Sequence, residues 1–478
     1  MYFETGNREE AIKYKLTAKE CLFGDAYFYK RAATVVLPMI IQNTLSNVVG
    51  LLDNVMIGQT GTFSMSAVAI VNQILFVFYL AIWGSLAGSG IFGTQFFGKG
   101  DIEGVHNTIR FKIYDVTVIL TIALVILSSF GKSLISLYIA ADTSAEAAAL
   151  TLNYGCSYLS IMLIGLIPFA ITQVYASAMR ESGKTTLPML ASMTAMLVNF
   201  VFNALLIFGL FFFPEMGVKG AAIATVISRF VELLIVLHGA HKKGSKYVFF
   251  KGLYTSLKIP SEMIWPFMSK TLPLLANELL WSLAQATLLR TYSTRGISII
   301  AAMNISGTIS QIFNEVFLSI GNSSGIIVGQ ELGADRLVNA RRSAWRMFFL
   351  SLYSTIVMGS LLALAAPFIP RIYKTEPEIK ALATSFILVV ALCMPINSSA
   401  NASYFILRSG GKIIVTFLFD SCFEWLILFP AAYLLCRFTS LPALNIYLIV
   451  SLLNIIKSII GFCLIKSGVW VRNIVKAV

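Results

Sequence analysis

Residues 116–130 read Val-Thr-Val-Ile-Leu-Thr-Ile-Ala-Leu-Val-Ile-Leu-Ser-Ser-Phe and contain no charged side chain. Comparable apolar runs recur along the chain, for example at 204–213 and 446–456. About 20 residues of α-helix cross the hydrocarbon core of a bilayer. Backbone groups in lipid must be satisfied internally, which leaves helices or a closed barrel. Because these runs are continuous rather than alternating, they predict membrane-spanning helices.

The overall composition supports a membrane protein. Of the 478 residues, 57% are hydrophobic and only 12% are charged, whereas a soluble domain carries about 25% charged residues. The lipid bilayer is therefore an expected partner. The net charge of +13 is better explained by basic loops facing anionic headgroups, and we expect no nucleic-acid partner. The six cysteines form no CxxC pair, so neither a disulfide framework nor a zinc site is indicated.

Three short patterns occur twice, in the same order and at nearly one spacing, which indicates a duplicated half-protein. In membrane proteins such repeats are typical of transporters with a site between the halves. The patterns are Arg180-Glu-Ser-Gly183-Lys184 with Arg408-Ser-Gly-Gly411-Lys412 (408 − 180 = 228), Gln95-Phe-Phe-Gly98 with Gln330-Glu-Leu-Gly333 (330 − 95 = 235), and Leu-Pro at Pro38 and Pro273 (273 − 38 = 235).

The apolar runs divide into twelve predicted spans, six in each half. An even number of spans returns the chain to its starting side, so both halves share one orientation and the repeat axis runs along the membrane normal. We therefore predict an all-α membrane protein with twelve transmembrane helices in two parallel-repeat six-helix lobes. The spans are 33–57, 64–96, 111–137, 148–174, 186–212, 217–240, 262–291, 297–326, 341–368, 379–406, 412–436 and 441–466.

Lys and Arg residues are unevenly distributed between the two sets of alternate loops. The richer set includes Arg110, Lys112 and five lysines near the middle of the chain. Basic loops stay on the cytoplasmic side, so we expect a multi-pass plasma-membrane protein, a monomer, with both termini cytoplasmic. The expected domains are a cytoplasmic N-terminal lead-in at 1–32, an N-lobe at 33–240, a cytoplasmic interlobe linker at 241–261, a C-lobe at 262–468 and a cytoplasmic C-terminal tail at 469–478.

Two glycine motifs match enzyme signatures but lie inside predicted spans. Gly88-Ser-Gly90-Ile-Phe-Gly93 matches a dinucleotide fingerprint, which needs a preceding strand in a soluble βαβ unit. Gly321-Asn-Ser-Ser-Gly325 matches a nucleophile elbow, which needs a strand–turn–helix context. We interpret the glycines as sites of close helix packing. The chain has only three histidines, all near basic edges, and we predict neither an enzyme nor a cofactor.

Asp53 is the strongest candidate for a functional group inside the membrane. An acidic residue at the bilayer centre costs about 2.5–3.5 kcal/mol on insertion scales and usually faces a cavity or a partner. The fifth span places Asn199 and Asn203 one turn apart on one face. One carboxylate and two carboxamides can bind a small hard cation such as Na⁺ or surround a carboxyl group that takes up a proton. The alternative is that Asp53 is an exposed residue at a helix end.

Other charged residues inside the spans have competing interpretations. Glu278 has Gln285 two turns later on the same face, and its alternative role is an interfacial pair with Lys270. Glu315 of the eighth predicted span is a further candidate site residue, but it could equally neutralise Arg290 or bind a neighbouring helix. We assign ion coupling to Asp53, Asn199, Asn203 and Glu278, and a substrate cavity to Gln42, Asn43, Asn47, Asn72, Gln173, Asn277, Gln285, Glu315 and Asn397.

Five further charged groups lie in the sixth, eleventh and twelfth predicted spans. Arg229 and Glu232 are three residues apart and are expected to form a local structural pair. Asp420 and Glu424 lie one turn apart, and their role stays open. Lys457 is expected to extend its ammonium group to an interface.

In this order, the motifs resemble the multidrug and toxic compound extrusion (MATE) family over about residues 30–466. The likeness rests on Leu37-Pro38, Asp53, Asn199-Phe-Val-Phe-Asn203, Asn277-Glu278 and the repeated patterns above. The resemblance implies a V-shaped pair of six-helix lobes, alternating access, and export of organic cations in exchange for inward H⁺ or Na⁺. It also implies that Asp53 and Glu278 stand at acidic positions of the family and that Asn199 and Asn203 are polar partners.

The chain departs from the family pattern in the tenth predicted span. An acid is common there eleven residues before the arginine, where this chain has Asn397 (408 − 11 = 397). An amide cannot take up a proton at neutral pH, so a C-lobe ion site built from several acids is weakened.

We therefore predict a secondary antiporter that exports organic cations or drugs in exchange for H⁺ or Na⁺. The alternative is a flippase for lipid-linked saccharide precursors on a related two-lobe scaffold. A flippase needs several cations to hold pyrophosphate, and the spans offer chiefly Lys270, Arg290 and Arg229. An intramembrane enzyme would need a nucleophile with a base within reach, and a channel is disfavoured by the two duplicated lobes.

Overall fold

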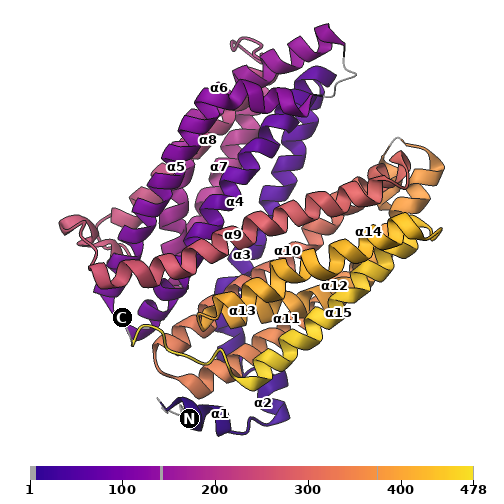
Figure 1. Ribbon diagram of the computed structural model, residues 1–478. Coiled ribbons are helices and arrows are strands. Elements are labelled where there is room, and N and C mark those ends of the chain that lie inside the picture. Colours follow the sequence, from indigo (N-terminus) through magenta and orange to yellow (C-terminus); the bar gives the residue numbers. More distant parts are fainter. Residues whose placement is uncertain (1–6, 140–143, 374, 477–478) are drawn as a thin grey trace. The chain divides into compact units, whose positions relative to one another are not determined.

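The computed structural model describes residues 7–139, 144–373 and 375–476. The first six residues of the expected lead-in and the last two of the expected tail lie outside this range. The described residues form helices and connecting turns, with no strand among them. The α-helices of Figure 1 are α1 (Arg8–Lys13), α2 (Ala18–Leu22), α3 (Ala26–Gly58), α4 (Thr62–Lys99), α5 (Ile102–Tyr138), α6 (Ala145–Glu181), α7 (Thr186–Phe208), α8 (Val218–His241), α9 (Ser261–Ser293), α10 (Ile297–Gly333), α11 (Leu337–Ala365), α12 (Pro377–Ser409), α13 (Ile413–Phe417), α14 (Phe429–Phe438) and α15 (Ala443–Ser467).

Short helical turns complete the architecture. The 3₁₀ turns η1 (Val248–Phe250) and η2 (Leu253–Thr255) lie in the linker, and η3 (Ile369–Ile372) follows α11. Between α13 and α14 the backbone passes through two π-helical turns, η4 (Leu418–Cys422) and η5 (Glu424–Leu428). The segment α13–η4–η5–α14 therefore forms one continuous span, Ile413–Phe438.

The predicted all-α membrane fold is confirmed. Within the described residues, eleven helical segments are long and apolar enough to cross a bilayer. The remaining predicted span, the seventh at 262–291, corresponds to α9, which at 33 residues is long enough but less apolar. Its charged residues, Glu278 among them, and the amides Asn277 and Gln285 lower its hydropathy.

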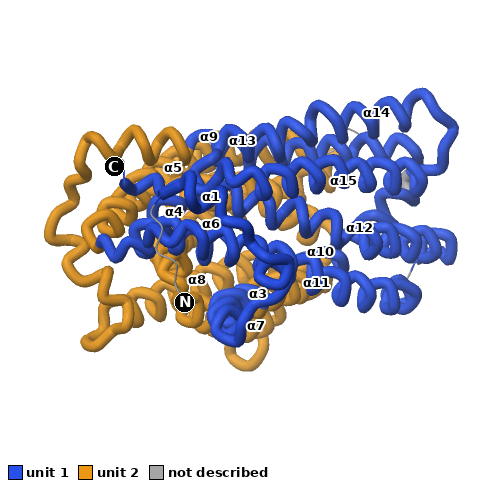
Figure 2. Tube along the Cα trace, turned by 90° about the horizontal axis from the view of Figure 1, so that it is seen from below, with its two compact units in different colours: residues 1–40, 91–101, 272–478 blue, residues 41–90, 102–271 orange. Residues whose placement is uncertain are grey.

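The chain forms two compact units, coloured separately in Figure 2. Unit 1 comprises Met1–Ile40, Ile91–Asp101 and Leu272–Val478, and unit 2 comprises Ile41–Gly90 and Ile102–Thr271. Helices α3, α4 and α9 each contribute residues to both units. The units thus divide the chain differently from the predicted lobes, whose bounds stay a prediction.

In unit 2, small residues allow helices to approach closely. Helix α6 packs against α5 and α8, and α8 packs against α7 (Figure 1). A Cβ added at Gly88 of α4 would lie 2.6 Å from the backbone nitrogen of Thr271 on α9. A Cβ at Gly90 would lie 2.7 Å from a carboxylate oxygen of Glu181. The packing interpretation of this glycine motif is therefore confirmed at these two positions.

The linker of unit 2 is fixed along α5. Arg110 donates hydrogen bonds to the Leu253 carbonyl at 3.3 Å, and its guanidinium pairs with Glu103 at 2.7 Å. Arg110 and Lys112 were expected in a loop, but α5 begins at Ile102, and both side chains are buried within the helical part of unit 2.

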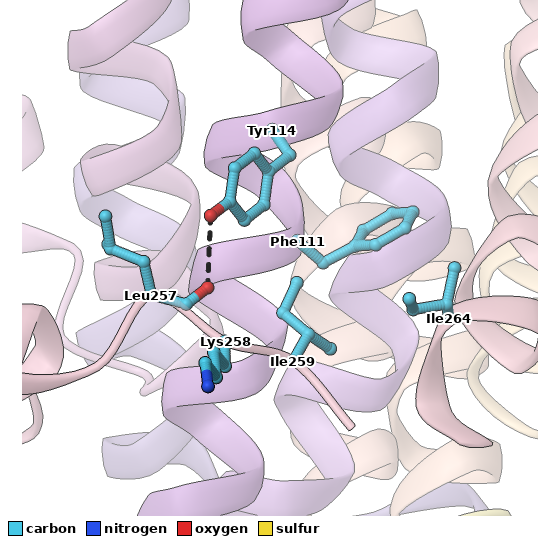
Figure 3. A pocket seen from close by; sticks show the side chains of 6 residues that line it. All are labelled: Phe111, Tyr114, Leu257, Lys258, Ile259 and Ile264. Carbon is cyan, nitrogen blue, oxygen red and sulfur yellow. Dashed lines mark hydrogen bonds between the residues drawn. The ribbon is translucent and has the colours of Figure 1, made fainter. Parts of the chain in front are cut away.

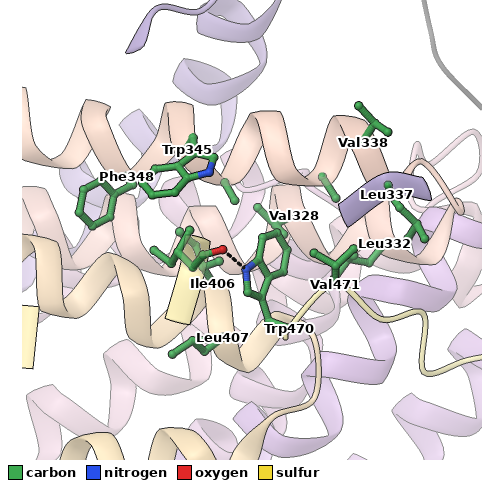
Figure 4. Close-up of a cluster of buried hydrophobic side chains, with 14 of the residues drawn as sticks. Val328, Leu332, Leu337, Val338, Trp345, Phe348, Ile406, Leu407, Trp470 and Val471 are labelled. Atoms are coloured by element: carbon green, nitrogen blue, oxygen red, sulfur yellow. Dashed lines mark hydrogen bonds between the residues drawn. The ribbon is translucent and has the colours of Figure 1, made fainter. Parts of the chain in front are cut away.

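In unit 1, α12 packs against α10, α11 and α15. An apolar cluster at one end of these helices surrounds the fully buried Trp470, whose indole nitrogen donates to the Ile465 carbonyl at 3.2 Å (Figure 4). Arg341 of α11 donates to the carbonyls of Ile12 and Tyr14 at 3.1 and 2.9 Å. These contacts attach the segments near both chain termini to the unit.

The two copies of the Gln-x-x-Gly pattern meet inside unit 1. A Cβ added at Gly98 of α4 would collide with the carbonyl of Gln330, and a Cβ added at Gly333 of α10 would collide with the carbonyl of Gln95. The glycine of each copy therefore packs directly against the backbone of the glutamine in the other copy. This reciprocal contact is the arrangement expected of two repeats related by a two-fold axis.

Candidate ion-binding sites

Asp53 of α3 lies against the two asparagines of α7. The Asn203 Nδ2 donates to Asp53 Oδ1 at 2.7 Å and lies 3.1 Å from Asn199 Oδ1. Asp53 is half-buried, whereas Asn199 and Asn203 are buried. The alternative interpretation of Asp53 as an exposed helix-end residue is therefore wrong, and the structure brings together the three side chains that helix periodicity selected.

The terminal amide of Asn199 lies at the carboxylate in either orientation. One of its atoms lies 3.0 and 3.1 Å from the two oxygens of Asp53. If that atom is nitrogen, Asn199 donates to the carboxylate and accepts from Thr225 Oγ1 at 3.3 Å. If it is oxygen, it accepts from Asn203 Nδ2 at 3.1 Å and lies beside the two carboxylate oxygens, an arrangement that a proton or a cation would stabilise. The Asn203 Oδ1 is buried and has no hydrogen-bond partner, so a further oxygen is available near the carboxylate.

A second polar group of unit 2 connects α3, α7 and α8. Gln42 donates to Ser192 Oγ at 2.8 Å, and Ser192 donates to Glu232 at 2.5 Å. Arg229 pairs with Glu232 at 3.4 Å, as predicted, and lies 4.9 Å from the centroid of the Phe169 ring. Arg229 is also close enough to act electrostatically on Asp53.

The remaining residues assigned to a cavity in unit 2 are more dispersed. Asn43 and Asn47 are half-buried on α3, and each interacts with at least one neighbouring residue. Asn72 accepts from the Tyr158 hydroxyl at 3.5 Å, and Gln173 accepts from Arg180 at 3.5 Å. None of the hydrogen bonds found among the described residues joins Asn72 or Gln173 to Asp53. Their assignment to a substrate cavity stays a prediction.

Unit 1 contains a separate polar cluster around Asn277 of α9. Its Nδ2 donates to Asp420 at 3.1 Å and to the Tyr404 hydroxyl at 3.4 Å. Its Oδ1 accepts from Ser421 at 2.7 Å. Gln285 of the same helix donates to Glu424 at 3.4 Å. Asn277 and Gln285 are thus both bound to the π-helical segment.

Lys457 of α15 belongs to this cluster. Its Nζ lies 2.5 Å from Asp420 and 3.8 Å from Glu424. The expectation that Lys457 extends to an interface is wrong, because its side chain is only 9% exposed and its charge is neutralised inside the unit. The sequence left the role of Asp420 and Glu424 open. In the structure both carboxylates face the buried ammonium group of Lys457.

The other predicted residues of unit 1 are Glu278, Glu315 and Asn397. Glu278 is half-buried, and no hydrogen bond or ion pair involves it within the described part of the chain. It is close enough to Arg408 and Asp420 to interact with them electrostatically. Glu315 and Asn397 are half-buried on α10 and α12. Their placement is compatible with a site, but the ion-coupling and substrate roles stay predictions.

Two carboxylate contacts in unit 2 were not predicted from the sequence. Lys112, which is fully buried, binds Glu181 and donates to Ser177 at 2.9 Å. Asp115 of α5 accepts from Ser85 of α4. A usable signal was the position of Asp115 and Lys112 next to the apolar run 116–130, since a charge there must be neutralised by a neighbouring helix.

A pocket of about 410 Å³ lies beside the linker of unit 2, and none of its lining residues belongs to these clusters (Figure 3). It is lined by four apolar residues together with Tyr114 and Lys258, and Tyr114 donates to the Leu257 carbonyl at 3.1 Å. The lining has no buried charge that would fix a ligand, so it is a poor candidate for a substrate site.

The donor atoms limit which ions these sites can hold. Across the described ranges, no group of three or more His, Cys, Asp or Glu side chains is arranged to bind a metal ion. A cation at Asp53 would therefore depend on one carboxylate and on amide oxygens, which suits Na⁺ or a proton better than a transition metal.

These observations define a class of protein before any comparison. A duplicated bundle of membrane-spanning helices buries ionisable groups within each unit. Such groups mark ion or substrate pathways, and internal repeats are typical of secondary transporters. The fold and its buried polar sites are those of a multi-pass membrane transporter.

Comparison with known proteins gives the family. The MatE family model matches twice, at residues 38–205 and 273–434. The matches begin at Pro38 and Pro273, which reproduces the repeat offset of 235 (273 − 38 = 235). Together they cover more than half of the chain, and the chain belongs to the MatE family.

Relatives and solved structures agree with this assignment. The chain is 24% identical over 461 residues to "Probable multidrug resistance protein NorM" of Thermotoga maritima, covering 93% of this chain and 94% of that protein. It is 25% identical to a protein of the same name from Bacillus thuringiensis subsp. konkukian, over 87% of this chain and 90% of that protein.

Two structures similar to this chain show the same fold. One is described as an outward-facing conformation of a multidrug resistance MATE family transporter, with a TM-score of 0.83, 18% identity, and coverage of 95% of this chain and 98% of that chain. The other is a MOP superfamily transporter from Pyrococcus furiosus, described as having a binding pocket of reverse polarity that suggests a different function, with a TM-score of 0.79, 18% identity and the same coverage.

Proposed function

We propose that this protein is a secondary antiporter that exports organic cations or drugs in exchange for H⁺ or Na⁺, with Asp53 as the ion-coupling carboxylate. The observation that carries the proposal is the contact of Asp53 with Asn203 at 2.7 Å, beside Asn199, inside the helices of unit 2. The multidrug resistance names of the relatives support the substrate class.

Exchange follows from competition for one negative charge. Ionised Asp53 favours a cationic substrate in the cavity of its unit, because an uncompensated carboxylate among membrane helices is costly. Binding of H⁺ or Na⁺ neutralises that charge and lowers the affinity for the substrate. Asn199 and Asn203 hold the carboxylate in place and supply amide oxygens to a metal ion. Coupling requires that the ion and the substrate bind differently to the outward- and inward-facing states.

Helix α3 is suited to respond to the ion. Pro38 lies inside α3, where its ring removes a backbone hydrogen bond and permits a bend. Asp53 is on the same helix, four turns further along. A change of charge at Asp53 can therefore be coupled to bending or repacking of α3 against α7.

Further details are part of the same proposal. The Glu278 side chain, which is half-buried and has no direct hydrogen bond within the described residues, is assigned to attract the positive charge of the substrate or to bind a second ion. We also propose that the protein acts as a monomer in the plasma membrane, with both termini cytoplasmic and without a resident cofactor. The flippase alternative is not favoured by any contact, because Arg229, one of the cations it needs, is paired with Glu232.

The proposal is tested by efflux of a lipophilic cationic dye from vesicles under separately imposed Na⁺ and pH gradients. We expect Asp53→Asn to lose gradient-driven efflux while the protein stays folded. Asp115→Asn is the matched control, because it removes another half-buried carboxylate of unit 2 that lies outside the proposed site. Full gradient-driven efflux in Asp53→Asn would exclude this carboxylate, and the effective gradient identifies the ion.

A further inference from the structure

The ammonium group of Lys457 is buried among oxygen atoms in unit 1. It lies 2.5 Å from Asp420 and 3.8 Å from Glu424, whose side chains are 18% and 7% exposed. The other face of the group is directed at the Phe419 ring, whose centroid lies 5.6 Å from Nζ. Lys457 thus occupies the position that a small bound cation would occupy between the two carboxylates.

The two carboxylates are also bound by amide groups of a neighbouring helix. Asn277 and Gln285 donate to Asp420 and Glu424 from α9, which holds both carboxylates toward Lys457. Asp420 and Glu424 lie in consecutive π-helical turns. Such turns are rare, and they frequently mark functional sites.

The repeat supplies an independent observation. Lys457 and Arg229 are 228 residues apart (457 − 229 = 228), as are Asp420 and Ser192 (420 − 192 = 228), which is the offset of the Arg-x-x-Gly-Lys patterns. The hydrogen bond between Gln42 and Ser192 in unit 2 has its counterpart between Asn277 and Asp420 in unit 1. Each half therefore places a cation of its last span near an equivalent polar pair.

The two halves use that cation differently. In unit 2, Arg229 pairs with Glu232 of its own helix. In unit 1, residue 460, which is equivalent to Glu232 (232 + 228 = 460), is an isoleucine, and Lys457 pairs instead with carboxylates of another helix. The ammonium group of Lys457 is therefore bound by carboxylates of another helix, whereas the guanidinium group of Arg229 is neutralised by a carboxylate of its own helix.

We propose that Asp420 and Glu424, supported by Asn277 and Gln285, form a monovalent-cation site whose resident ion is the ammonium group of Lys457. In the intact protein this site takes no external cation. Removal of the ammonium group converts it into a site for Na⁺ or a small primary alkylammonium ion, since two carboxylates and neighbouring oxygens are left without a counter-ion. This inference goes beyond the proposed function and does not depend on Asp53.

Other charged and titratable groups near the site do not supply the missing cation. On α9, Glu278 and Tyr292 interact electrostatically with Asp420 and Glu424 respectively, and on α12 Tyr404 interacts with Asp420. The cation Arg408 of α12 lies 6.0 Å from the centroid of the Tyr404 ring, and no ion pair joins it to Asp420 or Glu424 within the described residues. When the lysine charge is removed, the two carboxylates therefore have to be neutralised by a cation or a proton from solution, and only a bound cation gives a response that depends on the identity of the salt.

The experiment measures thermal unfolding of the purified protein in detergent while one chloride salt is varied at constant ionic strength. Every variant carries Asp53→Asn, so that binding at Asp53 does not contribute. In this background, Lys457→Ala is expected to unfold at a lower temperature in N-methylglucamine chloride, whose cation is too large for the site. Na⁺ or ethylammonium should raise that temperature saturably, and the parent with Lys457 intact should not respond.

The control is Lys457→Ala combined with Asp420→Asn, which removes one of the two carboxylates and should abolish the saturable response. An equal response of the parent and of Lys457→Ala to Na⁺ and ethylammonium would overturn the proposal. If Lys457→Ala yields folded protein only in the presence of one of these ions, that dependence supports it. If neither Lys457→Ala nor Lys457→Gln is recovered by either ion, the proposal is wrong.

Discussion

The reciprocal packing of Gly98 and Gly333 leads to a quantitative prediction for alanine substitutions. A Cβ at Gly98 would lie 2.6 and 2.7 Å from the carbonyl carbon and Cα of Gln330, and a Cβ at Gly333 would lie 2.5 and 2.6 Å from the same atoms of Gln95. Carbon atoms in contact are normally about 3.5–4.0 Å apart. The obstructing atoms are backbone, so α4 and α10 must separate by roughly 1 Å to accommodate one methyl group.

The expected cost follows from typical values for overpacking. Extra methyl groups in a packed interior cost about 1–3 kcal/mol, and here the upper part of that range applies because the neighbour is backbone. Replacing glycine by alanine in a helix returns about 0.4–1 kcal/mol through the unfolded chain. Gly98→Ala and Gly333→Ala should each lose about 1–2 kcal/mol of stability. The double variant should lose less than the sum, because one separation of the helices relieves both contacts.

Gly307→Ala is the matched control on α10, since nothing lies within 4 Å of a Cβ added there. It should be neutral or more stable by about 0.4–1 kcal/mol. Unfolding in detergent can be followed with a thiol-reactive dye as a rise above the initial reaction of accessible cysteines such as Cys463, because Cys393 of unit 1 is buried in the folded state. Equal stability of Gly333→Ala, Gly98→Ala and Gly307→Ala would refute the close contact of the two repeat copies.

Three further predictions concern buried contacts and use the same unfolding assay. Lys112→Met should cost about 3–5 kcal/mol, because it leaves Glu181 buried without its partner, and addition of Glu181→Gln should restore part of the loss. Gly88→Ala should cost about 1–3 kcal/mol through collision with the α9 backbone, whereas Gly50→Ala on α3, which has open space around it, should be neutral or stabilising. Trp470→Ala should cost about 3–5 kcal/mol, because the side chain is fully buried in the cluster of Figure 4.

The sequence was sufficient to predict the class of fold and the contact at Asp53. Apolar runs long enough to span a bilayer have few alternatives to helix, so the fold class depends on composition alone. Asn199 and Asn203 were recognisable because a spacing of four residues places two side chains on one helix face. Their contact with Asp53 required only that the first and fifth spans be neighbours, which the family resemblance supplied.

The cluster around Lys457 could not be predicted from the sequence. Asp420 and Lys457 are 37 residues apart on different helices, and no local pattern indicates which helix faces lie together. The π-helical turns also change the direction of Asp420 and Glu424 relative to a regular α-helix. Lys112 was placed in a loop for a different reason. Helix α5 begins at Ile102, ten residues before Lys112, and the charged residues in its first turns are typical of a loop sequence.

The two duplicated halves carry different ionisable groups at equivalent positions. With the offset of 235, the position equivalent to Asp53 in the second half is Leu288 (53 + 235 = 288), which is buried in an apolar cluster with Tyr292 and Ile299. The packing of the repeats is shared, but an exchangeable carboxylate at this position exists only in the first half. In the second half, Asp420 and Glu424 are held by Lys457. If Glu278 serves only to attract the substrate, the number of ions exchanged per substrate should fall to zero in Asp53→Asn. A fall to half of the original value would instead show that Glu278, which Lys457 does not hold, binds a second exchanging ion.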